Sequence, residues 1–137
     1  LNFAFNKNEK NNILETEALI YKIIGKLSHK RTRRNVTEIR VCSKRWVEFF
    51  KYIAGSGAVH KKLSREILVL PFKKQWEMIK TYIKGDGNLY TRRANNTPTN
   101  RINTASRDLA IQIQEILARG GLFASIKKDN RLLPNKK

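Results

Sequence analysis

Asp86 is the acidic residue of this chain whose surroundings best suit chemistry. Residues 79–87 read IKTYIKGDG, so its carboxylate lies between two glycines where a predicted helix gives way to a predicted strand, residues 88–93. The two other aspartates have structural explanations, because Asp108 falls in the first turn of a predicted helix and Asp129 in a Lys-Asp-Asn turn. Carboxylate oxygens are ligands that hard cations such as Mg²⁺ prefer. Taken alone, Gly-Asp-Gly is more typical of an ordinary turn.

Other kinds of reactive site are not indicated. His29 and His60 have no carboxylate or cysteine at ligand spacing, which argues against zinc and imidazole chemistry. The single cysteine, Cys42, excludes an internal disulfide framework. The sequence contains no phosphate-binding glycine loop, nucleophile elbow or dinucleotide fingerprint.

The charge of the chain predicts a polyanionic partner. Lys and Arg number 29 against 11 Asp and Glu, a formal net charge of +18 over 137 residues. Nucleic acid is the first expectation and an anionic membrane surface the second. No stretch approaches the roughly 18 apolar residues that a spanning helix needs, and no charged-then-apolar leader opens the chain. We therefore expect a soluble, intracellular protein, in an organelle or the cytoplasm.

A pattern of elements occurs twice. Residues 1–35 and 101–130 each read as strand, polar cap, amphipathic helix, glycine stop and basic strand. In the later copy Ser106 is the predicted cap and the helix ends at Gly120. Its apolar face comprises Leu109, Ile113, Ile116 and Leu117.

The earlier copy has a matching helix. Asn6 or Asn8 is the predicted cap, and Gly25 is the predicted stop. Its predicted apolar face comprises Leu14, Ala18, Tyr21 and Ile24.

The remaining elements complete two similar halves. Residues 27–34 and 36–43 should pair as a hairpin, residues 95–99 form a predicted turn between two strands, and Pro71 should start the helix that leads to Asp86. A further helix stops at a Gly-Ser-Gly turn, and its apolar side reads as core rather than as a base-stacking platform: Trp46, Val47, Phe49, Phe50 and Ile53. The order is β-α-β-β-α, then α-β-β-α-β.

This order predicts an α+β protein of two pseudo-symmetric αββαββα lobes. Residues 1–69 would form the first lobe without its opening helix and strand, and residues 70–137 the second lobe without its final strand and helix. Since the chain also starts at Leu, we expect its ends to be incomplete.

The chain resembles the LAGLIDADG homing endonucleases, including those embedded in introns and inteins. The resemblance covers nearly the whole chain and rests on the repeat order and on the helix that ends in Gly-Asp-Gly. The RINTASRDLA strand-to-helix step and the GSGAVHKKLSREIL linker add to it. In that family two lobes pair their motif helices, and their sheets form a saddle over the DNA major groove.

The resemblance implies a magnesium-dependent hydrolase that cleaves double-stranded DNA at a specific site. Asp86 would bind Mg²⁺ or Mn²⁺ together with Gly85, since phosphodiester cleavage needs a metal that activates water. Lys62 would stabilise charge at the active centre, its alternative being a solvated linker residue. Where family members commonly carry an acid and a small residue, this chain has Lys84 and Thr81.

Only one acidic motif is visible, so a partner acid must come from elsewhere. It would lie upstream in a two-lobed monomer or on a second chain that pairs with this one. We expect no membrane partner.

A set of strand residues is predicted to contact DNA. Two-stranded ribbons fit the major groove, where Arg can bind guanine bidentately and Lys and Arg neutralise phosphates. The alternative for any one of them is a solvated basic face. The set comprises Arg31, Arg33, Arg34, Arg40, Tyr90, Arg92, Arg93, Arg101, Asn103, Lys127 and Lys128.

Two other functions remain open. A binding module of the same fold could have lost cleavage and act on DNA as a regulator or on intron RNA as a maturase. A basic ribosomal or RNA-packaging protein, in which Gly-Asp-Gly is only a turn, belongs to a different class. Metal-dependent cleavage, metal-independent duplex binding and a preference for structured RNA separate the three.

Overall fold

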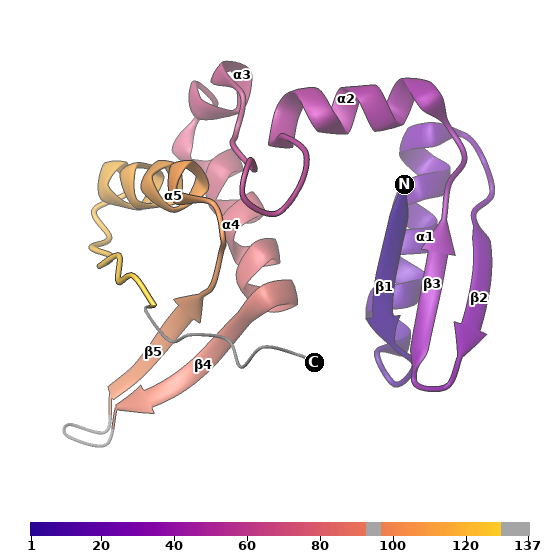
Figure 1. The fold of residues 1–137 in the computed structure, drawn as a ribbon, viewed down its shortest axis with the longest axis horizontal. Coiled ribbons are helices and arrows are strands. Elements are labelled where there is room, and N and C mark those ends of the chain that lie inside the picture. Colours follow the sequence, from indigo (N-terminus) through magenta and orange to yellow (C-terminus); the bar gives the residue numbers. More distant parts are fainter. Residues whose placement is uncertain (93–96, 130–137) are drawn as a thin grey trace, which may run out of the picture. The chain divides into compact units, whose positions relative to one another are not determined.

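The computed structural model describes residues 1–92 and 97–129, except the side chains of residues 89–92 and 97. It is a mixed α/β structure with two small antiparallel sheets in two compact units, Leu1–Lys51 and Tyr52–Lys137 (Figure 1). The elements of the first unit are β1 (Asn2–Asn6), α1 (Lys10–Ile24), β2 (His29–Arg33), β3 (Val36–Arg40) and most of α2 (Lys44–Ala54). Those of the second are α3 (Arg65–Leu68), α4 (Phe72–Asp86), β4 (Gly87–Arg92), β5 (Thr97–Ile102) and α5 (Arg107–Arg119).

The first unit is a three-stranded sheet covered on one side by α1. The strand order is β1-β3-β2, both pairings are antiparallel, and the predicted hairpin is confirmed with Arg33 opposite Val36. The strands alternate, so that Thr37 and Ile39 of β3 are buried on the side that α1 covers (Figure 1). Ile13 and Ile20 of α1 complete the buried cluster with Ile39 and Val41.

The predicted apolar face of α1 was right at Ile24, which packs against the buried cluster, and wrong at Leu14 and Tyr21. Leu14 is 61% exposed and Tyr21 62% exposed, whereas Ile13 and Ile20 are buried. The helix is apolar on more than one side, and contact with the sheet decides which side becomes core. The cap also differs: Glu9 is the N-cap and no side chain caps it, while Gly25 ends the helix as expected with φ 69°.

Helix α2 does not contribute to either buried cluster. Phe49 is 45% and Phe50 37% exposed, and no residue of the helix is buried. The rings instead contact one another, with centroids 5.3 Å apart for Trp46 and Phe49 and 5.6 Å apart for Phe49 and Phe50. The prediction that these aromatic residues form core was therefore wrong.

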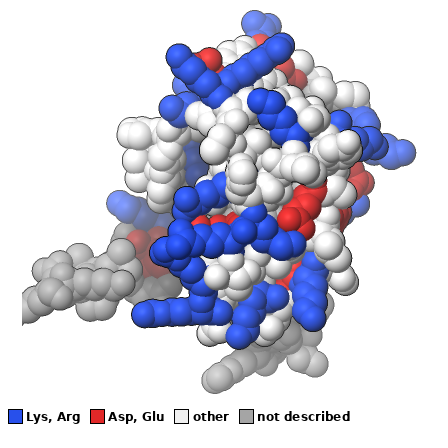
Figure 2. Space-filling view, turned by 90° about the vertical axis from the view of Figure 1, so that its right-hand side faces the viewer, with Lys and Arg blue, Asp and Glu red and all other residues white. Residues whose placement is uncertain are grey.

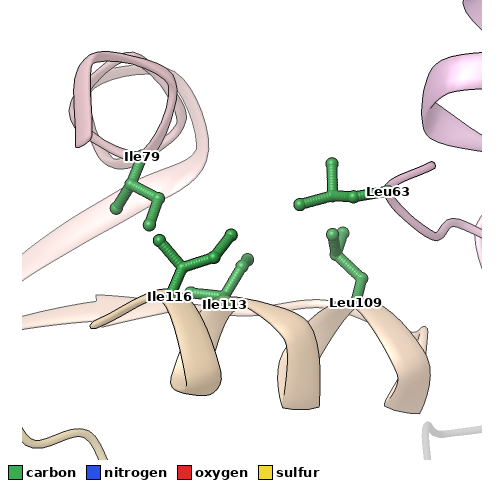
Figure 3. Packing of buried hydrophobic residues seen from close by; sticks show 5 residues of the cluster. All are labelled: Leu63, Ile79, Leu109, Ile113 and Ile116. Carbon is green, nitrogen blue, oxygen red and sulfur yellow. The ribbon is translucent and has the colours of Figure 1, made fainter. Parts of the chain in front are cut away.

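The core of the second unit lies between α4 and α5. Ile79 of α4 faces Ile113 and Ile116 of α5, and Leu109 and Leu63 extend the cluster (Figure 3). The later copy of the repeat was predicted correctly here: the Ser106 side chain caps α5 by accepting a hydrogen bond from the Leu109 N–H at 3.2 Å, and α5 ends before Gly120.

The linker before α3 is fastened to α5. The side-chain amide of Gln112 accepts a hydrogen bond from the Leu63 N–H at 2.7 Å and donates one to the Leu63 carbonyl at 3.0 Å. The Ser106 hydroxyl donates to the Lys61 carbonyl. Residues 52–69, which we assigned to the first lobe, thus lie in the second compact unit. The lobe boundary itself stays a prediction.

Two predicted segments differ from the structure. Residues 122–129 form neither helix nor strand, so the final basic strand was wrong; the Ala124 carbonyl instead accepts a hydrogen bond from the Gln114 side chain of α5 at 2.7 Å. Strand β5 already begins at Thr97 and includes Pro98, which we placed in a turn, while residues 95 and 96 lie outside the described residues. In the described part of the chain, every helix is too short or too polar to cross a membrane.

Candidate metal and nucleic-acid site

Asp86 is the last residue of α4, and Gly87 makes this placement possible. The Gly87 N–H donates to the Ile83 carbonyl, and the chain then turns directly into β4. A Cβ at Gly87 would overlap the Ile83 carbonyl oxygen and lie 2.8 Å from its carbonyl carbon and Cα. The backbone φ of −81° is ordinary, so glycine is required here by close approach rather than by conformation. The result is an exposed carboxylate at a helix end directly before a strand.

Gly85 differs from Gly87 because its missing side chain leaves open space. A Cβ there would meet nothing within 4 Å. A glycine inside a helix costs about 0.5–1 kcal/mol relative to alanine. Nothing in the packing of the described residues explains that cost, which leaves the Gly85 surface open to close approach by another group.

One further polar side chain accompanies Asp86. Tyr82 lies one turn earlier on α4, and its hydroxyl is 3.5 Å from the Asn103 carbonyl oxygen. Burial raises the pKa of the Tyr82 phenol, a hydrogen bond with Thr104 lowers it in part, and the negative charge of Asp86 raises it further. Tyr82 therefore keeps its proton at neutral pH. We missed this residue, although the four-residue spacing from Asp86 indicated a shared helix face.

The described residues supply only part of a metal site. Among them no group of three or more His, Cys, Asp or Glu side chains is close enough to hold an ion. Mg²⁺ commonly binds one or two protein carboxylates and completes its shell with waters and substrate phosphates. Asp86 and the carbonyl of Gly85 fit such a role as one half of the donor set. A second acid and phosphate oxygens would complete the set.

Lys62 lies in the linker of the second unit with an exposed side chain. Its backbone N–H donates to the Ala54 carbonyl at 3.2 Å. Within the described part of the chain its ammonium group forms no ion pair with Asp86. Its assignment to the active centre stays a prediction.

The side of the first sheet that α1 does not cover is basic. We call it the open face, and the strand register gives its members: Asn2, Ala4, Asn6, His29, Arg31, Arg33, Val36, Glu38 and Arg40. Arg31, Arg33 and Arg40, three residues of the predicted DNA-binding set, lie here and are exposed. Glu38, the acidic member, pairs with Arg40 at 2.8 Å. Arg34 lies at the tip of the hairpin and is also exposed.

The other predicted DNA-binding residues lie in the second unit. Arg101 on β5 is exposed opposite Asn88 of β4, and Asn103 is exposed directly after β5. Tyr90 and Arg92 are on β4 without described side chains, and Arg93 is outside the described residues. Lys127 and Lys128 are exposed in the segment that we wrongly expected to be a strand.

The basic character of the molecule is visible on its surface. On the face drawn in Figure 2, Lys and Arg side chains are spread widely, with few acidic side chains among them. This distribution is typical of a surface that binds a polyanion.

A helix that ends in Gly-Asp-Gly and passes straight into an antiparallel hairpin defines the class of this domain. Residues 73–136 match the family model of the LAGLIDADG-like domain. Residues 73–136 therefore form a LAGLIDADG-like domain.

The chain is also similar to short segments of much longer proteins. Over 73 residues it is 40% identical to an iron–sulfur cluster assembly SufBD family protein of Mycobacterium tuberculosis, covering 53% of this chain and 8% of that protein. Over 113 residues it is 34% identical to the ATP-dependent DNA helicase Hel308 of Thermococcus kodakarensis, covering 80% of this chain and 10% of the helicase. The chain thus spans at most about a tenth of these curated relatives.

Proposed function

We propose that this chain is part of a site-specific, metal-dependent endonuclease that hydrolyses phosphodiesters in double-stranded DNA. The observation that carries the proposal is the α4 end, where Gly87 lets the chain turn so closely that Asp86 stands exposed at the helix terminus. The family match over residues 73–136 supports it.

Each part of the chain has a distinct role in this proposal. Asp86 and the Gly85 carbonyl would hold the cation, which would supply activation of water and stabilisation of the leaving oxygen. The uncovered surface at Gly85 receives the helix that brings the partner acid, from upstream sequence or a second chain. Arg31, Arg33 and Arg40 contact the duplex through the open face.

The nature of the relatives supports an inserted module. The matched segments form 8% and 10% of two proteins whose names describe iron–sulfur cluster assembly and DNA unwinding. We take a similarity to short segments of two such differently named proteins as a sign of an inserted domain. We therefore propose that it is the endonuclease part of an intein or a similar inserted element.

The test is cleavage of a plasmid library in Mg²⁺ by this chain and by any longer product of its gene. Asp86→Asn is expected to abolish cleavage while duplex binding persists. Asp108→Asn is the matched control, because it removes the same charge from the exposed first turn of α5. Cleavage that survives in Asp86→Asn would refute the assignment.

A DNA-binding module without cleavage is the second candidate. It is favoured by the absence of an acidic cluster among the described residues. Intact plasmid for every protein, together with tight duplex binding that needs no metal, would establish it.

A further inference from the structure

A basic hollow lies in the first unit on the side of the sheet opposite to the open face. Its volume is about 260 Å³, and it lies between the first turns of α1 and the helix-facing side of β2. Its lining residues are Lys7, Lys10, Ile13, Leu14, Lys30, Thr32 and Thr37. Three lysines, two apolar residues and two threonines therefore line this space.

The two threonine hydroxyl groups in this hollow have one unused hydrogen-bond donor. The Thr32 and Thr37 Oγ1 atoms are 3.0 Å apart, and Thr37 is only 4% exposed. Because each hydroxyl carries one hydrogen, their mutual bond uses one and leaves the other for a further acceptor. An oxygen of a bound anion is such an acceptor.

The start of α1 places Lys10 beside the hollow. The first turn contains no acidic residue, and Glu9 at the N-cap makes no side-chain cap. The Glu9 carboxylate instead accepts hydrogen bonds from the Asn6 N–H at 2.7 Å and from the Asn12 side-chain amide at 3.1 Å. Glu9 is an acidic residue at the positive end of the helix dipole and offsets part of it, so the positive charge of the hollow comes from its lysines.

Strand β2 connects the hollow to the open face. It reads HKRTR and is exposed at every residue, with Arg31 and Arg33 on the open face and Lys30 and Thr32 on the hollow side. In the strand order β1-β3-β2 it is an edge strand, so its outer N–H groups have no partner strand. Lys30 also pairs with Glu17 at 2.8 Å. Among the residues that the structure describes, Lys7 and Lys10 have no acidic partner.

We propose that the β2 edge and the adjoining hollow bind a backbone phosphate of duplex DNA, in addition to the contacts of the open face. The inference rests on the proposed DNA binding. The phosphate oxygens accept hydrogen bonds from Lys7, Lys10 and the threonine pair, so that the DNA backbone follows the edge of the sheet. This contact contributes affinity without reading sequence.

The experiment measures how duplex affinity of the full chain depends on salt. Each phosphate contact contributes about 0.9 to the slope of log affinity against log salt concentration, so Lys7→Gln with Lys10→Gln is expected to make the slope shallower by about 1. Lys22→Gln with Lys26→Gln is the control, because it removes equal charge at the other end of α1. Equal changes of slope in both pairs, or none in the first, would overturn the proposal.

Two further arms separate the possible failures. Arg31→Gln with Arg33→Gln tests the open face: if this pair leaves binding intact while the Lys7 and Lys10 pair weakens it, the proposed recognition surface fails and the hollow stands. Inorganic phosphate is the probe for the unmodified chain, and it should shift the amide resonances of Lys10 and Thr32 but not of Lys22. Phosphate shifts without any change of slope would show a free-anion site and overturn the assignment to DNA.

Discussion

At the residue scale, the two positions beside Asp86 are glycine for opposite structural reasons. Gly87 is required because the backbone of Ile83 occupies the space of a side chain, whereas Gly85 faces nothing within 4 Å. The sequence predicts the Gly-Asp-Gly corner but treats the glycines alike. Only the path of the strand after the helix tells them apart.

Gly87→Ala is expected to lower the free energy of unfolding by about 1–3 kcal/mol, because the methyl group would force the strand away from the helix end. Gly85→Ala should instead raise it by about 0.5–1 kcal/mol, since alanine favours the helix. Urea denaturation of both variants is the measurement. If both substitutions have the same sign, the close approach at Gly87 is not a source of constraint.

The same pair also separates stability from the proposed catalysis. A Gly85→Ala protein that is more stable yet cleaves DNA more weakly would support close approach of a second helix at this surface. Unchanged cleavage would leave Gly85 without that role.

At the element scale, helix α5 was predictable and helix α1 only in part. In α5 one apolar stripe follows a serine cap, so Leu109, Ile113 and Ile116 could be placed before the structure was known. In α1 isoleucine and leucine are adjacent at positions 13 and 14, and both registers fit a helical period. Contact with the sheet buries Ile13 rather than Leu14. A local sequence pattern does not predict such a contact between distant segments.

The corrected face of α1 can be tested by truncation. Ile20→Ala should cost about 2–4 kcal/mol of unfolding free energy, because Ile20 is 5% exposed in the cluster beneath the sheet. Leu14→Ala should change it by less than about 0.5 kcal/mol, because Leu14 is 61% exposed. Chemical denaturation compares the two, and a larger loss in Leu14→Ala would restore the face predicted from sequence.

The linker is held to α5 by the Ser106 hydroxyl and by the Gln112 side chain, and Gln112 makes two of these hydrogen bonds. Gln112→Ala would leave the N–H and carbonyl of Leu63 without their partners, at an expected cost of about 1–3 kcal/mol. Glu115→Ala on the exposed side of α5 is the control and should be nearly neutral. Thermal unfolding followed by circular dichroism measures both, and equal effects would show that the linker is held by other contacts.

At the scale of the whole molecule, the two compact units have separate buried clusters that share no residue. The order of elements was predicted from the repeat, apart from the short α3 and the final strand. The arrangement of the lobes and the identity of the partner acid could not be predicted. Both depend on contacts with chain segments or molecules that the sequence of one unit does not specify.

The chain carries one tryptophan in each unit, Trp46 and Trp76, which makes the separation measurable. Ile116→Ala in a Trp46→Phe background should lower the unfolding midpoint reported by Trp76, because Ile116 is fully buried in the second cluster. In a Trp76→Phe background the same substitution should leave the Trp46 midpoint unchanged. Equal shifts for both reporters would mean that the units unfold as one.

The turn between β2 and β3 indicates a compromise between stability and the proposed DNA binding. Arg34 has φ 52°, in the left-handed region that glycine adopts without cost and that costs other residues about 1–2 kcal/mol. Arg34→Gly should therefore make the protein more resistant to urea and bind duplex DNA less tightly. If resistance falls instead, the arginine stabilises its own turn. If both effects appear, the hairpin tip is strained in order to place a positive charge at the end of the open face. A substitution that makes this protein more heat-tolerant would then lower its affinity for duplex DNA.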